Sequence, residues 1–229
     1  MGRITRLLAL VLLGAAGTTG GLVAQVRGLP VRNAGIGTGF GIAADIGFPN
    51  GDAGKGVAVG ATGQIGLGPL GVSATISHWK PKDIDAINAA GGTASLKIFG
   101  GPLIPLSVTL QAGAAYSKLS SQGVEGMITD KSWHVPVGLG LALTIPNPVF
   151  SIKPWVAPRV DVFRNERTDP IATSPVTSTF THFGVSAGID FGFINGMSLR
   201  AMYDRVEAGH GAHPSIVSVG AGYGIRLHL

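Results

Sequence analysis

Three groups of residues in this sequence are of types that could do chemistry. An aspartate and two histidines, Asp45, His134 and His182, would supply general acid and base groups if the fold brought them together. The stretch 207–213 combines one glutamate with two histidines, which suits metal coordination. A third group of acidic and basic residues is spread along the chain. Each of these groups can act only if rigid strands or helices hold its side chains in place. The predicted secondary structure therefore indicates which groups are positioned to act.

The end of the chain is the clearest of these elements. From Ser215 to Leu229, apolar residues occupy one parity and small or polar residues the other. Successive side chains of a strand point to opposite faces, so this pattern predicts a strand with one apolar face. A tilted strand needs about 9 to 11 residues of such alternation to cross a bilayer. The apolar parity consists of Val217, Val219, Ala221, Tyr223, Ile225, Leu227 and Leu229.

The same alternation recurs upstream and predicts nine further strands. We expect them near residues 36–48, 56–67, 70–79, 93–100, 105–118, 133–144, 150–162, 182–193 and 197–206. Pro154 and Pro158 fall within the seventh, where we expect a bend or bulge because proline cannot donate to the ladder. The alternative is eight strands, if the fourth or the seventh is miscounted.

The connections between these strands alternate in length. Long polar segments follow the odd-numbered strands, including 119–131 and 164–179, and short turns follow the even-numbered ones. The turn at Gly68-Pro69 predicts that Leu67 lies opposite Leu70. The three-residue turn at 194–196, with glycine in the left-handed conformation, predicts that Asp190 lies opposite Arg200.

Aromatic residues gather near both ends of the predicted strands. Such girdles are typical of a membrane-spanning band. Near the long connections these residues are Phe48, Trp79, Tyr116, Trp133, Phe183 and Tyr203, and near the short turns they are Phe150, Phe191 and Phe193.

The first residues and the composition indicate export. Met1–Ala24 has Arg3 and Arg6, an apolar run and small residues before Gln25, which predicts a signal peptide cleaved after Ala24. Residues 25–35 then form a short lead-in, which we expect in the periplasm. The chain has no cysteine, so it has no disulfide framework. The net charge of +5 comes from scattered basic residues without an aromatic platform, which argues against nucleic-acid binding.

Together, the signal peptide, the alternating strands, the asymmetric connections and the apolar last strand resemble the small single-chain outer-membrane β-barrel proteins of Gram-negative bacteria. The resemblance covers 36–229 and implies a closed, antiparallel, transmembrane up-and-down barrel with both termini in the periplasm. It implies contact with outer-membrane lipid and lipopolysaccharide. It also implies recognition by the barrel-insertion machinery through Tyr223, Ile225, Leu227 and Leu229, although the family usually ends in an aromatic residue and Leu229 is not one.

Within such a barrel, the charged residues of the inward parity gather near the short turns. Asp190, Arg200 and Arg226 lie at similar depth on three neighbouring strands, and Lys153 and Lys97 extend the group. Charges removed from bulk water persist when they are paired. This lumen charge cluster is therefore either a salt-bridge network that plugs the barrel or a constriction that favours anions.

The predicted function is not enzymatic, and we expect no cofactor and no metal site. Glu207, His210 and His213 fall on a loop without a rigid element to fix them. We expect a structural or surface-exposed membrane protein, or a narrow passive diffusion pore. The alternatives are a lipid-modifying hydrolase at the barrel rim, built around Asp45, His134 and His182, and an adhesin that acts through its external loops.

Overall fold

The computed structural model describes residues 26–82, 84–100, 104–123, 126–170, 174–209 and 211–225. The predicted signal peptide and its cleavage site lie outside these residues. Within them there is no helix long and apolar enough to cross a membrane.

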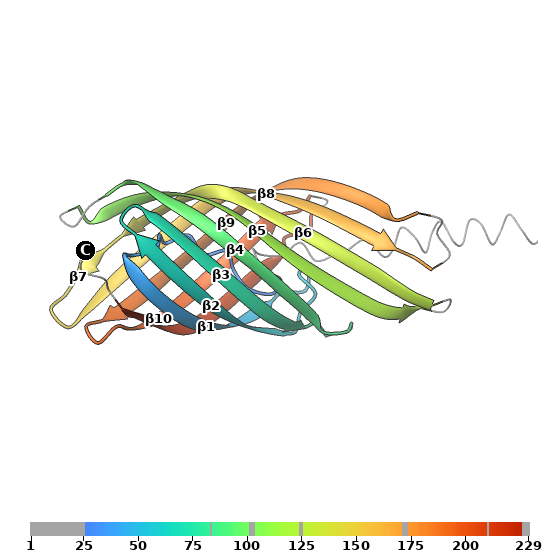
Figure 1. Ribbon diagram of the computed structural model, residues 1–229, viewed down its shortest axis with the longest axis horizontal. Helices are drawn as coiled ribbons and strands as arrows, with labels where there is room; N and C mark the ends of the chain where they lie inside the picture. The colour runs from blue at the N-terminus through green and yellow to red at the C-terminus, as the bar shows by residue number, and fades with distance from the viewer. Residues whose placement is uncertain are drawn as a thin grey trace, which may run out of the picture.

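The described residues form one closed antiparallel barrel of ten long strands, with a two-residue strand, β7, beside β8 (Figure 1). Neighbours in sequence pair around the barrel, β6 pairs directly with β8, and β1 pairs with β11 to close it. The strands are β1 (Gly39–Pro49), β2 (Val57–Leu67), β3 (Leu70–Lys80), β4 (Ile87–Phe99), β5 (Leu106–Gly123), β6 (Gly126–Leu143), β7 (Ile145–Pro146), β8 (Phe150–Thr168), β9 (Val176–Phe193), β10 (Met197–Glu207) and β11 (Ser215–Ile225). The prediction of a ten-stranded barrel is confirmed, and the eight-stranded alternative is wrong.

The two predicted hairpin registers are also confirmed. Leu67 pairs with Leu70 across the β2–β3 turn. Asp190 of β9 pairs with Arg200 of β10, and Gly196 in their turn has a φ of 86°. These registers follow from the turn geometry and from keeping like faces together.

Two connections are shorter than the sequence predicts. Residues 119–131 and 164–179 were expected as long loops, but β5–β6 pairing continues to Gly123 opposite Gly126, and β8–β9 pairing continues to Arg167 opposite Val176. These extensions carry polar residues on both faces, so the alternation that marks a membrane strand is lost although the pairing persists. Figure 1 shows both hairpins projecting beyond the ends of the other strands.

At the prolines of β8, where a bend or bulge was expected, the pairing is interrupted but no residue is inserted. The β6–β8 ladder omits Ala157 and Pro158 but keeps the same register on both sides of them. The register shift lies instead in β4, between Lys97 and Phe99. Pro158 is therefore accommodated by skipped pairs and not by an extra residue.

The outer face of the barrel is apolar. Ile42, Val72 and Ile76 are each more than half exposed, as residues of a lipid-facing surface would be. Among the predicted girdle residues, Phe48, Trp133, Phe183 and Tyr203 are exposed on this face. Trp79 does not belong to the girdle, because it is buried in the lumen and its Nε1 donates to the carbonyl of Lys55 at 3.1 Å.

Candidate functional site: a lumen occupied by the N-terminal segment

The N-terminal segment, residues 26–38, lies inside the barrel. We define the loop end as the end with the connections after β1, β3, β5, β8 and β10, and the turn end as the opposite one. Val26 packs with Ala89 and Ala115, and Leu29 packs with Trp79, in the half nearer the loop end. The segment then descends towards the turn end and enters β1 at Gly39. The sequence predicted a periplasmic lead-in at 25–35, whereas the structure places its described part in the lumen.

Inward-facing glycines of the wall make room for this segment. A Cβ on Gly47 would collide with the carbonyl oxygen of Gly28, and a Cβ on Gly140 would collide with that of Asn33. A Cβ on Gly66 would collide with the carbonyl oxygen of Gly37. The glycines therefore let the backbone of the segment approach the wall closely along its length.

One side of the lumen, formed by β8, β9 and β10, holds the segment through charges. We call this the charged wall: Arg159, Asp161, Ser186, Asp190 and Asp204. Asp204 accepts the backbone N–H of Val31 at 3.0 Å, Arg159 Nη2 at 2.8 Å and Ser186 Oγ at 3.0 Å. Arg159 Nε also donates to Asp161 at 2.9 Å. Side chains this deeply buried are stable as ions only when they are paired, so the network fixes Asp204 as an acceptor for the segment.

His134 of β6 joins the same network. Its Nε2 lies 2.8 Å from Asp161 Oδ1, and its ring stacks on Phe163 with centroids 4.3 Å apart. His182 contacts Phe163 and Phe180 through its ring. Asp45 pairs with Arg200. The three residues of the predicted rim site therefore have different partners, and the Asp–His pair that does form involves Asp161, which is fully buried.

The predicted lumen charge cluster is partly assembled. Asp190 and Arg200 are cross-strand neighbours, and Lys153 lies opposite Asp190 on the other side. Asp190 forms its ion pair with Arg32 of the N-terminal segment, at 2.6 Å. Lys97 lies on β4, opposite Thr109. Arg226 lies outside the described residues.

Arg200 pairs with a residue that lies 155 positions away in the sequence. Its Nε donates to Asp45 Oδ1 at 2.6 Å, and its Nη2 contacts Asp45 Oδ2. The two residues are on β10 and β1, with Gly220 of β11 between them in register. A Cβ on Gly220 would collide with Asp45 Oδ1, so glycine allows the pair to meet across a strand.

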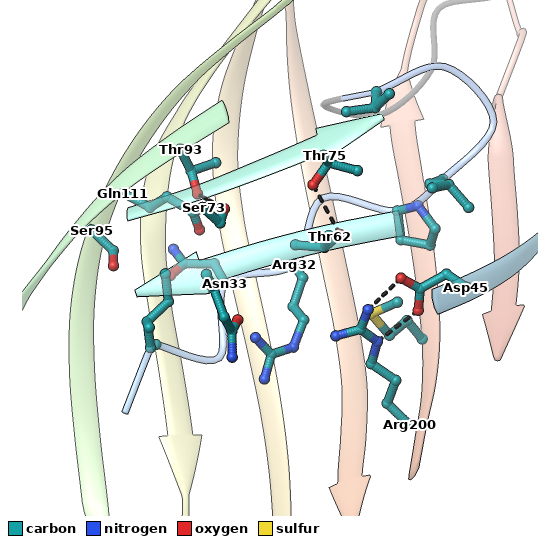
Figure 2. A pocket seen from close by; sticks show the side chains of 17 residues that line it. Arg32, Asn33, Asp45, Thr62, Ser73, Thr75, Thr93, Ser95, Gln111 and Arg200 are labelled. Atoms are coloured by element: carbon teal, nitrogen blue, oxygen red, sulfur yellow. Dashed lines mark hydrogen bonds and ion pairs between the residues drawn. The ribbon is translucent and has the colours of Figure 1, made fainter. Parts of the chain in front are cut away.

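The opposite side of the lumen, formed by β2, β3 and β4, is rich in hydroxyl groups. We call this the hydroxyl wall: Thr62, Ser73, Thr75, Thr93 and Ser95. Thr62 and Thr75 hydrogen bond to each other at 2.9 Å, and so do Ser73 and Thr93 at 2.6 Å. A cavity of about 50 Å³ lies between this wall and the segment. Figure 2 shows the Thr62–Thr75 pair above Arg32, which lies between Asn33 and the Asp45–Arg200 pair.

At the turn end the lumen opens into a vestibule. This space of about 1050 Å³ is lined by turn-end residues of β1, β2 and β7 to β11, and it extends around the rim to outward-facing residues such as Phe40, Ile42 and Tyr223. Arg32, Gln64 and Arg200 line both the vestibule and the smaller cavity. The two spaces therefore meet at two arginines and a glutamine.

Arg205, Glu207 and His213 form a small ion-pair group at the loop end. His213 Nδ1 lies 2.7 Å from Glu207 Oε2, and Arg205 Nε donates to Glu207 Oε1 at 2.8 Å. His210 lies outside the described residues. In the described part of the chain, no group of three or more His, Cys, Asp or Glu residues is arranged to hold a metal ion.

Sequence reasoning missed the segment in the lumen and most of the charged wall. Arg159 and Asp161 have the inward parity of β8, and Asp204 shares the parity of Arg200, so their positions signal lumen charges. The excess of inward glycines signals that something approaches the wall closely. Neither pattern identifies residues 26–38 as the occupant.

No family model matches the sequence, and no curated protein matches it. Among solved structures, the chain is similar to the outer membrane protease OmpT from Escherichia coli, at 10% identity and a TM-score of 0.44, covering 82% of this chain and 94% of that one. It is also similar to the attachment invasion locus protein Ail of Yersinia pestis in complex with a heparin analogue, at 12% identity and a TM-score of 0.42, covering 82% and 97%. The KdgM porin matches at 8% identity and a TM-score of 0.38, covering 81% and 99%. At these TM-scores the likenesses assign no function to this chain.

Proposed function

We propose that this chain is a bacterial outer-membrane β-barrel that forms a narrow passive pore, closed at rest by its own residues 26–38. The apolar outer face and the closed ladder support the membrane location, because a bilayer offers no partners for unpaired strand edges. We assign the turn end, where β1 begins and β11 ends, to the periplasm. In this assignment the described start of the chain, Val26, lies in the half of the lumen that faces away from the periplasm.

The observation that carries the pore proposal is the polar cavity beside the segment. The hydroxyl wall lines a cavity that meets an open vestibule, and the segment contacts the opposite wall through two acidic residues, Asp190 and Asp204. A barrel that served only as a membrane anchor would gain stability from a lumen filled by apolar side chains. A polar lumen with a removable occupant suits the passage of small hydrophilic solutes.

The proposed function involves no catalysis. The Asp161–His134 pair is buried, with side-chain exposures of 0% and 6%, so a substrate has no access to it in this conformation. We also propose that the insertion machinery contacts the outer face of β11 through Tyr223 and Ile225, which are exposed. Leu227 and Leu229 lie outside the described residues.

The experiment that tests this function is single-channel recording in a planar bilayer. The refolded protein is compared with a variant in which residues 27–37 are replaced by a glycine-serine linker of the same length. We expect the unaltered protein to be closed for most of the recording and the linker variant to show discrete conductance steps. Equal conductance, or silence of a linker variant that is inserted and heat-modifiable, would contradict the proposal.

The projecting hairpins favour a second candidate, an adhesin. The β5–β6 and β8–β9 extensions stand beyond the other strands and expose Met127, Val176 and Phe180. Shortening β8–β9 by removing residues 165–178 would abolish attachment of expressing cells to a host surface if this candidate is right. Unchanged attachment would exclude it.

A further inference from the structure

Three residues that line the cavity between the N-terminal segment and the hydroxyl wall each carry a polar atom without a hydrogen-bond partner. Arg32 Nε, Asn33 Oδ1 and Gln111 Oε1 are all buried, and the three residues line this one cavity. Asn33 and Gln111 are 5% and 6% exposed. A buried polar atom without a partner costs about 1 to 3 kcal/mol, so three on the residues of one cavity indicate that a bound molecule supplies partners.

The chemistry of the three atoms defines what such a ligand must offer. The guanidinium Nε–H donates a hydrogen bond, while the two amide oxygens accept one each. The complementary ligand therefore accepts one hydrogen bond and donates two. A primary amide does this, because its carbonyl oxygen can accept from Arg32 and its two N–H groups can donate to Asn33 and Gln111.

The charges beside the cavity exclude an ionic ligand. Arg200 is paired with Asp45 through both of its contacting nitrogens, and Arg32 is paired with Asp190. An anion or a cation would have to break one of these pairs or remain uncompensated in a partly buried site. A neutral ligand leaves both pairs intact.

The size of the cavity sets the scale of the ligand. A water molecule needs about 10 to 15 Å³ of such space, so a cavity of about 50 Å³ accommodates three or four atoms of that size. We propose that this cavity is a binding site for small uncharged molecules that both donate and accept hydrogen bonds, with short primary amides as the best fit. The inference goes beyond the proposed pore by naming a ligand of its closed state, and binding does not depend on the pore function.

Binding is tested on the full-length refolded protein in detergent micelles by saturation-transfer difference NMR. The probes are acetamide and acetate, which have the same shape and differ in charge. We expect acetamide to receive saturation and acetate to receive none above background. Equal signals from the two probes would overturn the proposal.

Variants then locate the site. Gln111→Leu removes one acceptor, and we expect it to weaken acetamide binding about three- to tenfold, the effect of one hydrogen bond. Gln122→Leu is the matched control, because it lies on the same strand but is exposed in the β5–β6 extension. Asn33→Ala tests the same site from the N-terminal segment, where a substitution leaves the strands unchanged. If Gln111→Leu and Asn33→Ala both bind acetamide as Gln122→Leu does, the site is wrong.

Transport separates this inference from the proposed function. If acetamide binds through Gln111 but the linker variant does not conduct, the pore proposal fails and the binding site stands. If the linker variant conducts but acetamide does not bind the unaltered protein, the pore stands and the proposed ligand class is wrong.

Discussion

The charged wall and the hydroxyl wall face the same N-terminal segment but interact with it differently. The charged wall accepts a backbone N–H of the segment at Asp204 and an arginine at Asp190. The hydroxyls of the facing wall mostly bond to one another, as Thr62 does with Thr75, or to the backbone of a neighbouring strand, as Ser95 does with Gly71. Nearer the loop end, Ser77 of β3 donates to the carbonyl of Arg27 at 2.9 Å.

The two walls therefore have different roles: the charged wall holds the segment, and the hydroxyl wall does not. Buried charges with fixed partners hold the segment in one position, because moving it would leave Asp204 and Asp190 with fewer partners. Hydroxyl groups that satisfy each other lose little when the segment leaves, since water replaces it. Changes to the charged wall should therefore have large effects, and changes to the hydroxyl wall small ones.

Asp204→Ala should have the largest effect. It removes the acceptor of the Val31 N–H and leaves Arg159, whose side chain is 2% exposed, with Asp161 as its remaining carboxylate. Breaking a buried ion pair costs about 3 to 5 kcal/mol. The free energy of unfolding, from urea titration of the refolded protein in lipid vesicles, should fall by this amount. A loss below about 1 kcal/mol would mean that the network does not hold the segment.

Gly47→Ala should displace the segment without removing a charge. Its new Cβ would collide with the backbone oxygen of Gly28, and overpacking of this kind costs about 1 to 3 kcal/mol. We expect more frequent channel openings in bilayer recordings. Gly63→Ala, on the neighbouring strand, is the matched control because its Cβ would meet nothing within 4 Å. Similar recordings from the two variants would argue against close packing of the segment.

Arg32→Ala should have an intermediate effect that depends on salt. The Arg32–Asp190 pair is partly exposed, with side-chain exposures of 24% and 13%, so it is screened more than the buried pairs. The open probability of the unaltered protein should rise with ionic strength, whereas that of Arg32→Ala should be higher and nearly independent of salt. The same salt dependence in both proteins would show that the Arg32–Asp190 pair does not hold the segment.

Thr62→Val should have the smallest effect. It removes one hydroxyl of a pair that water can replace, for a cost of about 1 kcal/mol or less. Unfolding free energy and open probability should both stay close to those of the unaltered protein. An effect as large as that of Asp204→Ala would erase the distinction between the two walls.

Much of the barrel could be predicted from the sequence because strand alternation and turn geometry depend on residues that are close together in the chain. The apolar parity of each strand identifies its outer face, and a tight turn such as Gly68-Pro69 fixes the register of Leu67 and Leu70. The extensions of β5–β6 and β8–β9 were mistaken for loops, since strands with water on both faces show no alternation.

The site could be predicted only in part, because its contacts join distant residues. The charges Asp190 and Arg200 were correctly placed as neighbours, but each pairs with a residue from the first fifth of the chain, Arg32 and Asp45 respectively. Residues 26–38 have no alternation and no turn signal that would place them in a lumen. Only the three-dimensional fit between their backbone and glycines such as Gly47 and Gly140 does so.

The labelling rate of a single cysteine in the N-terminal segment reports directly whether that segment occupies the lumen. The natural sequence has no cysteine, so Val31→Cys and the control Ile194→Cys each carry one. Val31 is 2% exposed in the lumen, and Ile194 is 82% exposed in the β9–β10 turn. With a water-soluble maleimide and the folded protein in lipid vesicles, Val31→Cys should react about a hundredfold more slowly than Ile194→Cys, and equally fast after heat denaturation. Equal rates in the folded barrel would show that the segment does not occupy the lumen.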